Sequence, residues 1–161
     1  MTRQIRIREP DSALDARVVL LDDAAPRSAE ILWKIAGAGG AHEAIHAMWT
    51  GPEISCPIPE ANLPAEVDLR DLPLENATIY PEEGAIAVVY VPANTYQGQA
   101  PFGFFDVGVF YGRGARLLLP MGWVQASVCG RVLREDLAAA SAACQSIRRR
   151  GACRLSFLQD A

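Results

Sequence analysis

The sequence contains no apolar stretch long enough to cross a membrane, and its first residues lack the apolar core of a secretory leader. It also lacks the C-x-x-C pairs that mark many zinc sites and redox centres. A disulfide framework is therefore not expected, and reduced, mostly buried thiols in a cytoplasmic protein are predicted. The cysteines concerned are Cys56, Cys129, Cys144 and Cys153.

The sequence also lacks a long segment of positive charge. The chain has 15 Lys and Arg residues against 19 Asp and Glu residues, for a formal net charge of −4, and the basic residues are scattered. Nucleic-acid-binding proteins usually concentrate basic residues on one face or along one segment. We therefore expect a small-molecule ligand as the partner, and neither nucleic acid nor a membrane.

The usual motifs of nucleotide-binding and serine-dependent enzymes are missing. No serine elbow or phosphate loop occurs, and Gly108, Gly112, Gly114 and Gly122 do not have the G-x-G-x-x-G spacing of a dinucleotide site. The triplet Gly112-Arg113-Gly114 instead predicts a hairpin turn. We therefore expect a protein that works without a bound cofactor.

What is present suits a single domain that spans residues 1–161. Half of the residues are apolar, which is enough for a core without metals or disulfides. Alternating apolar and polar residues predict about eight short strands, and two further segments have the acidic starts and glycine ends of helices. This pattern predicts a mainly β fold, a closed antiparallel barrel capped by two helices. The predicted strands are 4–8, 17–21, 53–58, 85–91, 104–111, 115–119, 124–133 and 153–157, and the predicted helices are 22–36 and 135–150.

The longest β-like run, residues 85–91, follows a turn at residues 81–84. Glu75 and Asn76 lie shortly before that turn, where a rigid strand would hold them in place. Polar loop residues that a rigid scaffold positions are candidate site residues. The alternative is that Asn76 stabilises the loop and that Glu75 is solvated.

The segment His42-Glu43-Ala44-Ile45-His46 matches the H-E-x-x-H motif. On a helix, this spacing places two imidazoles on one face to bind zinc, with the glutamate as general base. The context argues against such a helix, because glycines crowd both ends of the motif, and the chain has no third histidine to serve as a ligand. The alternative is an exposed first histidine and a strand that starts at the second and leads into Trp49.

Four segments of the sequence occur in a recognisable order: His46-Ala47-Met48-Trp49-Thr50-Gly51, then Pro73-Leu74-Glu75-Asn76-Ala77-Thr78 with Pro81 and Gly84, then the strand to Val91, then Leu119-Pro120-Met121-Gly122. Together they resemble a bacterial family of unknown function with a cyclophilin-like barrel, across about residues 15 to 158. Pro52 departs from the family pattern because it lengthens the step from Trp49 to Glu53, which leaves the role of Glu53 open.

The same barrel is similar to the cucumopine and mikimopine opine synthases. Those enzymes condense histidine with 2-oxoglutarate through an imine and a ring closure, without a cofactor. None of their catalytic residues maps onto this chain. The Arg, Phe and Gln that cyclophilin isomerases carry in fixed strand motifs are also not found here, so the resemblance implies no prolyl isomerase activity.

On this fold, the candidate residues would meet at the mouth of the barrel. A glutamate desolvated beside Trp49 would have a raised pKa and could move a proton, with neutral His46 as its counterpart. Asn76 would hold an oxyanion or a carboxylate oxygen, while core packing is the alternative role for Trp49. The predicted catalytic residues are Glu75, His46 and Glu53, and the predicted substrate-binding residues are Asn76, Trp49 and Tyr96.

These residues predict a small-molecule-binding protein that acts as a cofactor-independent enzyme. Its substrate would be a small amino-acid-derived, keto-acid-derived or cyclic nitrogen compound, and its reaction a proton transfer coupled to imine formation, ring closure or ring opening. One alternative is a non-catalytic metabolite-binding or accessory subunit with exposed apolar surface at Phe102, Phe104 and Phe105. Another is a zinc hydrolase that uses His42 and His46. We also expect a homo-oligomer, because small barrels often associate through sheet edges or apolar loops.

Overall fold

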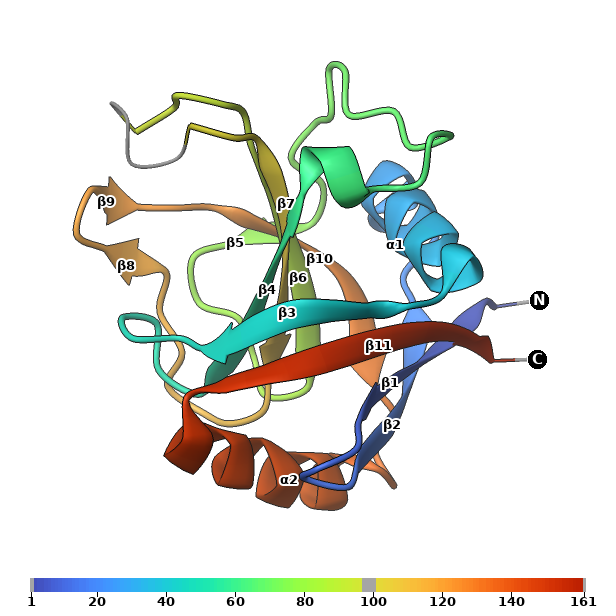
Figure 1. Ribbon diagram of the computed structural model, residues 1–161, viewed down its shortest axis with the longest axis vertical. Helices are drawn as coiled ribbons and strands as arrows, with labels where there is room; N and C mark the ends of the chain where they lie inside the picture. Colours follow the sequence, from blue (N-terminus) through green and yellow to red (C-terminus); the bar gives the residue numbers. More distant parts are fainter. Residues whose placement is uncertain (1, 97–100, 161) are drawn as a thin grey trace.

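The computed structural model describes residues 2–96 and 101–160. Within these ranges, nine strands form one antiparallel sheet in the order β2-β1-β11-β3-β4-β7-β6-β10-β5 (Figure 1). β2 also pairs with β10, so the sheet closes into a barrel of eight described strands, and the short β5 is an extra strand on β10. The elements are β1 (Gln4–Glu9), β2 (Leu14–Leu20), α1 (Pro26–Ala38), β3 (Ala41–His46), β4 (Glu53–Pro59), the 3₁₀-helix η1 (Glu60–Asn62), β5 (Ala77–Thr78), β6 (Ala85–Val91), β7 (Phe104–Phe110), β8 (Leu118–Leu119), β9 (Gly122–Trp123), β10 (Ala126–Val132), α2 (Leu137–Arg150) and β11 (Ala152–Asp160).

The predicted fold class, a closed antiparallel barrel with two helices, is confirmed. Two strand predictions differ from the structure. Of residues 115–119, only the last two form a strand, because the Arg116 and Leu117 N–H groups bond the carbonyls of Thr50 and Ile79 rather than a ladder partner. The strand predicted to start at His46 instead ends there, since β3 covers residues 41–46.

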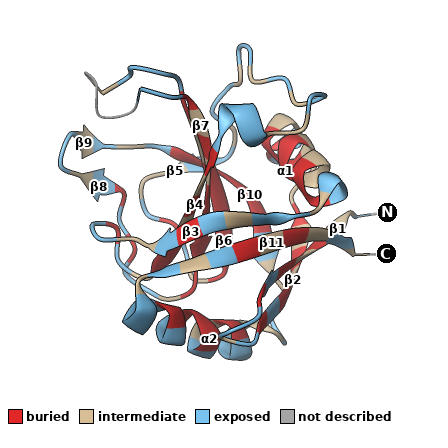
Figure 2. Ribbon diagram, in the orientation of Figure 1, coloured by how far each residue is buried: buried red, intermediate tan, exposed pale blue. Residues whose placement is uncertain are grey.

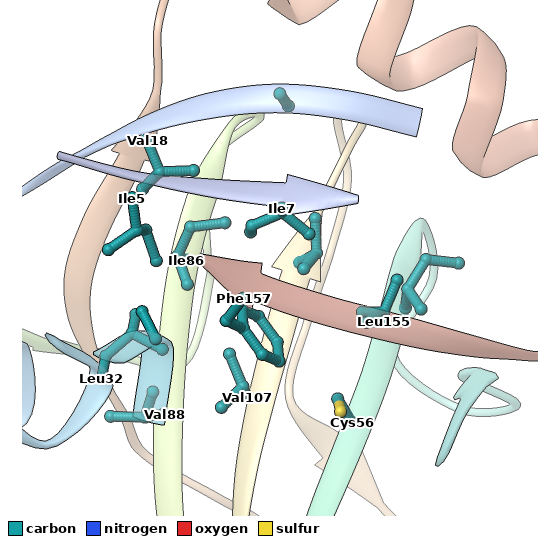
Figure 3. Packing of buried hydrophobic residues seen from close by; sticks show 14 of the residues in the cluster. Ile5, Ile7, Val18, Leu32, Cys56, Ile86, Val88, Val107, Leu155 and Phe157 are labelled. Atoms are coloured by element: carbon teal, nitrogen blue, oxygen red, sulfur yellow. The ribbon is translucent and has the colours of Figure 1, made fainter. Parts of the chain in front are cut away.

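Apolar side chains fill the interior of the barrel. Alternate residues of each strand point inward, and β6 contributes Ile86 and Val88 to one continuous buried cluster. Figure 3 shows both in this core together with Phe157 of β11 and Leu32 of α1. Ile147 of α2 is fully buried in the same cluster. The centre of the barrel is therefore a packed core.

A second apolar cluster lies on the outer face of the same strands. Ala87 of β6, Phe110 of β7 and Ala126 of β10 belong to it, and the segment of residues 111–125 adds Leu117. That segment carries the β8–β9 hairpin, which stands away from the barrel and is more exposed than the strands beneath it (Figure 2). The part of the segment around Leu117, rather than the hairpin, covers part of the barrel's outer face.

The two helices pack on different strands. α1 lies against β11 and β10, and α2 against β2 and β11 (Figure 1). Each ends before a glycine with positive φ, Gly39 and Gly151, and the Gly151 N–H donates to the carbonyl of Ile147. Across the two described ranges, neither helix has the length and apolar character needed to cross a bilayer.

Candidate functional site

A cavity of about 220 Å³ lies on the outer face of the barrel. Alternate residues of β4, β6 and β7 form its floor, and the loop of residues 47–52 and the segment 111–125 form its walls. The predicted location at a hollow barrel mouth is wrong, because the core side chains fill the interior. The apolar lining includes Trp49, Phe104, Phe110, Leu117 and Val124, and the polar lining includes Thr50, Glu53, Ser55 and Asp106.

Glu53, at the start of β4, is only 6% exposed although it is acidic. Its Oε2 accepts a hydrogen bond from the Thr50 hydroxyl, whereas its Oε1 has no hydrogen-bond partner among the described residues. A Cβ atom at Gly108 would lie 2.6 Å from Oε1, so glycine there makes room for the carboxylate. Burial, helped by the negative charge of Asp106, raises the pKa of Glu53 to about 7, against the lowering effect of the Thr50 hydrogen bond.

Asp106 is the second carboxyl group of the cavity, and it lies in the middle of β7. The Ser55 hydroxyl donates to its Oδ1 and Oδ2, at 2.9 and 3.1 Å. Burial raises the pKa of Asp106 to about 6, while the hydrogen bonds from Ser55 and from the Cys56 backbone act in the opposite direction. The carboxylate is therefore held in place and stays a stronger base than an exposed aspartate.

The strand register brings these two carboxyl groups into one cavity. Ser55 pairs with Gly108, and Asp106 lies two residues before Gly108 on the same face of β7. Two residues along a strand span about 7 Å, so the Glu53 carboxylate beside Gly108 lies near Asp106. Burial raises both pKa values toward neutrality, so near pH 7 the two carboxyl groups can hold a single proton between them. The cavity then contains one base and one acid.

Asp106 was missed by the sequence analysis. The only signal is a lone acidic residue within the otherwise apolar strand Phe104-Phe105-Asp106-Val107-Gly108-Val109-Phe110. A charge in such a strand is costly unless it has partners or a function. Its partner Ser55 lies on β4, 51 residues away in sequence.

Among the described residues, the His46 imidazole makes no hydrogen bond to Glu53. It borders the cavity. In the sheet, however, His46 pairs with Ile54, whose side chain is buried in the core. Its Nδ1 donates to the carbonyl of Ala47 at 2.9 Å, and its Nε2 bonds the Tyr111 hydroxyl at 2.7 Å. The imidazole is thus committed to neighbours on the other side of the sheet from Glu53.

Glu75 and Asn76 do not line the cavity, so the predicted position of this pair is wrong. Glu75 caps helix α1: its Oε1 accepts from the Arg27 N–H at 3.1 Å and its Oε2 from the Ser28 N–H at 2.8 Å. A carboxylate at a helix N-terminus satisfies unpaired N–H groups and favours the helix dipole. Asn76 has a positive φ of 48° and its Nδ2 donates to the carbonyl of Val128. Both residues stabilise the fold locally.

The variant Glu75→Ala should therefore lose about 1–2 kcal/mol of unfolding free energy and keep normal ligand binding at the cavity. The loss follows because two N–H groups of the first turn of α1 lose their acceptor. Urea unfolding measures it, with Glu66→Ala on the exposed loop as the matched control. If Glu75→Ala leaves stability unchanged and abolishes ligand binding, Glu75 is a ligand-binding residue and not a helix cap.

The zinc-hydrolase interpretation is contradicted by the secondary structure. The H-E-x-x-H motif forms strand β3 and not a helix, so His42 and His46 lie about 13 Å apart along the strand. The His42 ring packs against Phe157, and Glu43 points to the opposite face. Residues 2–96 and 101–160 contain no group of three or more His, Cys, Asp or Glu side chains that could hold a metal ion.

Trp49 and Tyr96 both border the cavity, as a substrate-binding role requires. Trp49 is 57% exposed, which contradicts the alternative of core packing. Its indole lies on the loop that walls the cavity, next to Met48 and Thr50. An exposed aromatic residue at a cavity rim has both apolar surface and a ring face to offer a ligand.

Comparison with known proteins identifies the family. Residues 8–159 match a family described as a protein of unknown function, DUF3830. The chain belongs to the DUF3830 family. This confirms the expected membership in a family of unknown function. No curated protein matches the sequence.

Several solved structures share the fold of this DUF3830 protein. McbB, solved in complex with tryptophan, matches with a TM-score of 0.60 and 15% identity; the match covers 98% of this chain and 45% of McbB. A cyclophilin-type peptidyl-prolyl cis-trans isomerase from Cryptosporidium parvum has a TM-score of 0.50 and 10% identity, over 100% of this chain and 99% of the isomerase. The Mimivirus cyclophilin gives a TM-score of 0.49 and 14% identity, over 98% and 87%. The chain thus spans less than half of McbB, and the similarity to the Cryptosporidium parvum isomerase shows a cyclophilin-like fold.

Proposed function

We propose that this DUF3830 protein is a cofactor-independent enzyme that transfers protons on a small amino-acid-derived or cyclic nitrogen compound. The observation that carries the proposal is the pair of carboxyl groups, Glu53 and Asp106, in one largely apolar cavity. Their pKa values, about 7 and about 6, lie near neutral pH, where general acids and bases are most effective.

The pair supplies the two proton transfers that imine formation, ring closure or ring opening requires. Ionised Asp106 removes a proton from the substrate, and protonated Glu53 gives one to the oxygen or nitrogen where negative charge develops. The Ser55 and Thr50 hydroxyls fix the orientation of the two carboxyl groups. The apolar lining around the two carboxyl groups lowers the local polarity, which strengthens both interactions.

McbB gives this proposal indirect support. It shares the fold, and its structure contains tryptophan. Tryptophan belongs to the substrate class proposed here, because it is an amino acid with an apolar aromatic body.

The proposal is tested by hydrogen exchange in deuterium oxide, followed by mass spectrometry. Amino acids, cyclic amides and amine–keto acid mixtures are incubated with the protein, and deuterium uptake or product formation is measured. Glu53→Gln and Asp106→Asn should each lower the rate by at least about 100-fold, whereas Glu66→Gln should leave it unchanged. Equal rates in all variants, or no exchange and no product with any compound that binds, would overturn it.

A non-catalytic binding or accessory subunit is the second candidate function. It is favoured by exposed apolar side chains near the cavity, such as Met48 and Trp49. Of the three phenylalanines predicted for this surface, Phe102 is 77% exposed, Phe104 lines the cavity and Phe105 is fully buried. Thermal stabilisation by a compound that is never turned over would support this candidate.

The remaining expectations concern the protein's surroundings. A homo-oligomer, a cytoplasmic location and the absence of a nucleic-acid partner all stay predictions from the sequence. The exposed side chains of Met48, Trp49, Met121 and Trp123 are apolar surface that would be available to association.

A further inference from the structure

The part of the cavity lining that the structure describes contains acidic side chains and no lysine or arginine to balance them. Among the lining residues within the described ranges, Glu53 and Asp106 are acidic and none is lysine or arginine. The His46 imidazole bonds Ala47 and Tyr111 instead of either carboxyl group. An ionised carboxylate in this cavity therefore has no lysine or arginine beside it among the lining residues, unlike the ion-paired carboxylates elsewhere in the described part of the chain.

One carboxylate oxygen is left without a donor. Glu53 is more than nine-tenths buried, yet its Oε1 has no hydrogen-bond partner within the described residues. Oε1 lies over Gly108, which lines the cavity floor, so it faces the cavity. A buried carboxylate oxygen needs a hydrogen-bond donor. An N–H group of a ligand would supply such a donor.

The rest of the lining is apolar and aromatic. Trp49, Phe104, Phe110 and Leu117 surround the two carboxyl groups. The ring faces of Trp49 and Tyr96 also attract cations. The cavity volume of about 220 Å³ suits a small molecule.

We infer that the cavity selects a small ligand that presents a protonated nitrogen to Glu53 and Asp106 and packs an apolar body against Trp49 and Phe110. This inference rests on the proposed function and narrows its substrate class. Amines and protonated cyclic nitrogen compounds fit the cavity, whereas a free keto acid has a carboxylate and no cation to pair with the two carboxyl groups. In the first step, the ammonium nitrogen passes one proton to the Asp106 carboxylate, which gives a neutral amine and a carboxylic acid.

Three aromatic probes of similar size and different charge test this inference: benzylamine, benzyl alcohol and benzoate. Isothermal titration at about pH 7.5, where an alkyl ammonium is protonated, should show benzylamine binding about 10- to 100-fold tighter than benzyl alcohol, and benzoate weakest. Glu53→Gln and Asp106→Asn should each reduce the preference for the amine by about tenfold while benzyl alcohol affinity is retained. Glu66→Gln should keep the full preference.

Benzoate binding as tightly as benzylamine would overturn the inference, as would an amine preference that survives in both carboxyl variants, or no binding of any probe. The proposed function fails separately. If the amine preference is found but no compound undergoes proton exchange or turnover, the result supports the charge selectivity and contradicts the proposed enzyme activity. If keto acids exchange protons and benzylamine does not bind, the result supports the proposed enzyme activity and contradicts the charge selectivity.

Discussion

Replacing Glu53 by glutamine should make the folded protein more stable at alkaline pH, by up to about 3 kcal/mol in unfolding free energy. The pKa of Glu53 is raised from 4.5 to about 7 by burial and by Asp106. Above that pH, folding must keep an ionised carboxylate in a largely apolar cavity. Glutamine has nearly the same shape, still accepts from the Thr50 hydroxyl and carries no charge, so it removes this cost.

The effect has a defined pH window. Between about pH 4.5 and 7, the unfolded state loses its proton before the folded state does, so the wild-type protein loses stability as pH rises. The gain from Glu53→Gln should therefore be close to zero below about pH 4.5 and complete above about pH 7. Urea unfolding across this range measures it, with Glu66→Gln as the control. A gain that is independent of pH would contradict the assigned pKa.

Gly108→Ala should have the opposite effect on stability, with a loss of about 1–3 kcal/mol. An alanine normally stabilises a strand relative to glycine, but a Cβ at this position would lie 2.6 Å from Glu53 Oε1 and 2.8 Å from the Phe110 ring. The Glu53 carboxylate would have to move, so binding of cavity ligands should be lost as well. Calorimetric unfolding and ligand titration measure the two effects.

A double variant separates two causes of the stability loss in Gly108→Ala: the contact of the new methyl group with Glu53 and its contact with the Phe110 ring. Combining Gly108→Ala with Glu53→Ala removes the carboxylate and should recover part of the lost stability, while the contact with the Phe110 ring remains. If the two substitutions add without coupling, the Glu53 carboxylate does not lie over Gly108 and the geometry of the site is wrong.

The fold could be predicted from local sequence patterns because alternation and turns are local signals. The strand at residues 85–91 has the predicted limits, since Gly84 and Pro92 bound a continuous run of apolar and β-branched residues. The H-E-x-x-H segment shows the limit of motif matching. Its letters fit a zinc helix, but its glycine-rich flanks and its pairing with β11 make it a strand.

The site was predicted only in part, because strand register and long-range contacts assemble it. Glu53, Trp49 and Tyr96 do line one cavity. Glu75 is an acceptor for helix α1, and its contact with Ser28, 47 residues earlier, leaves no local signal. Asp106 joins Glu53 through the pairing of β4 with β7, which alternation within one strand does not reveal.

Carbon-13 NMR titration of the side-chain carboxyl groups tests the central claim most directly. The two resonances that disappear in Glu53→Gln and Asp106→Asn give the assignments. Midpoints near neutrality, about 7 for Glu53 and about 6 for Asp106, are expected, and benzylamine should shift both resonances. If both groups titrate at about pH 4, as exposed carboxyl groups do, and do not respond to the amine, the outer-face cavity is not an acid–base site.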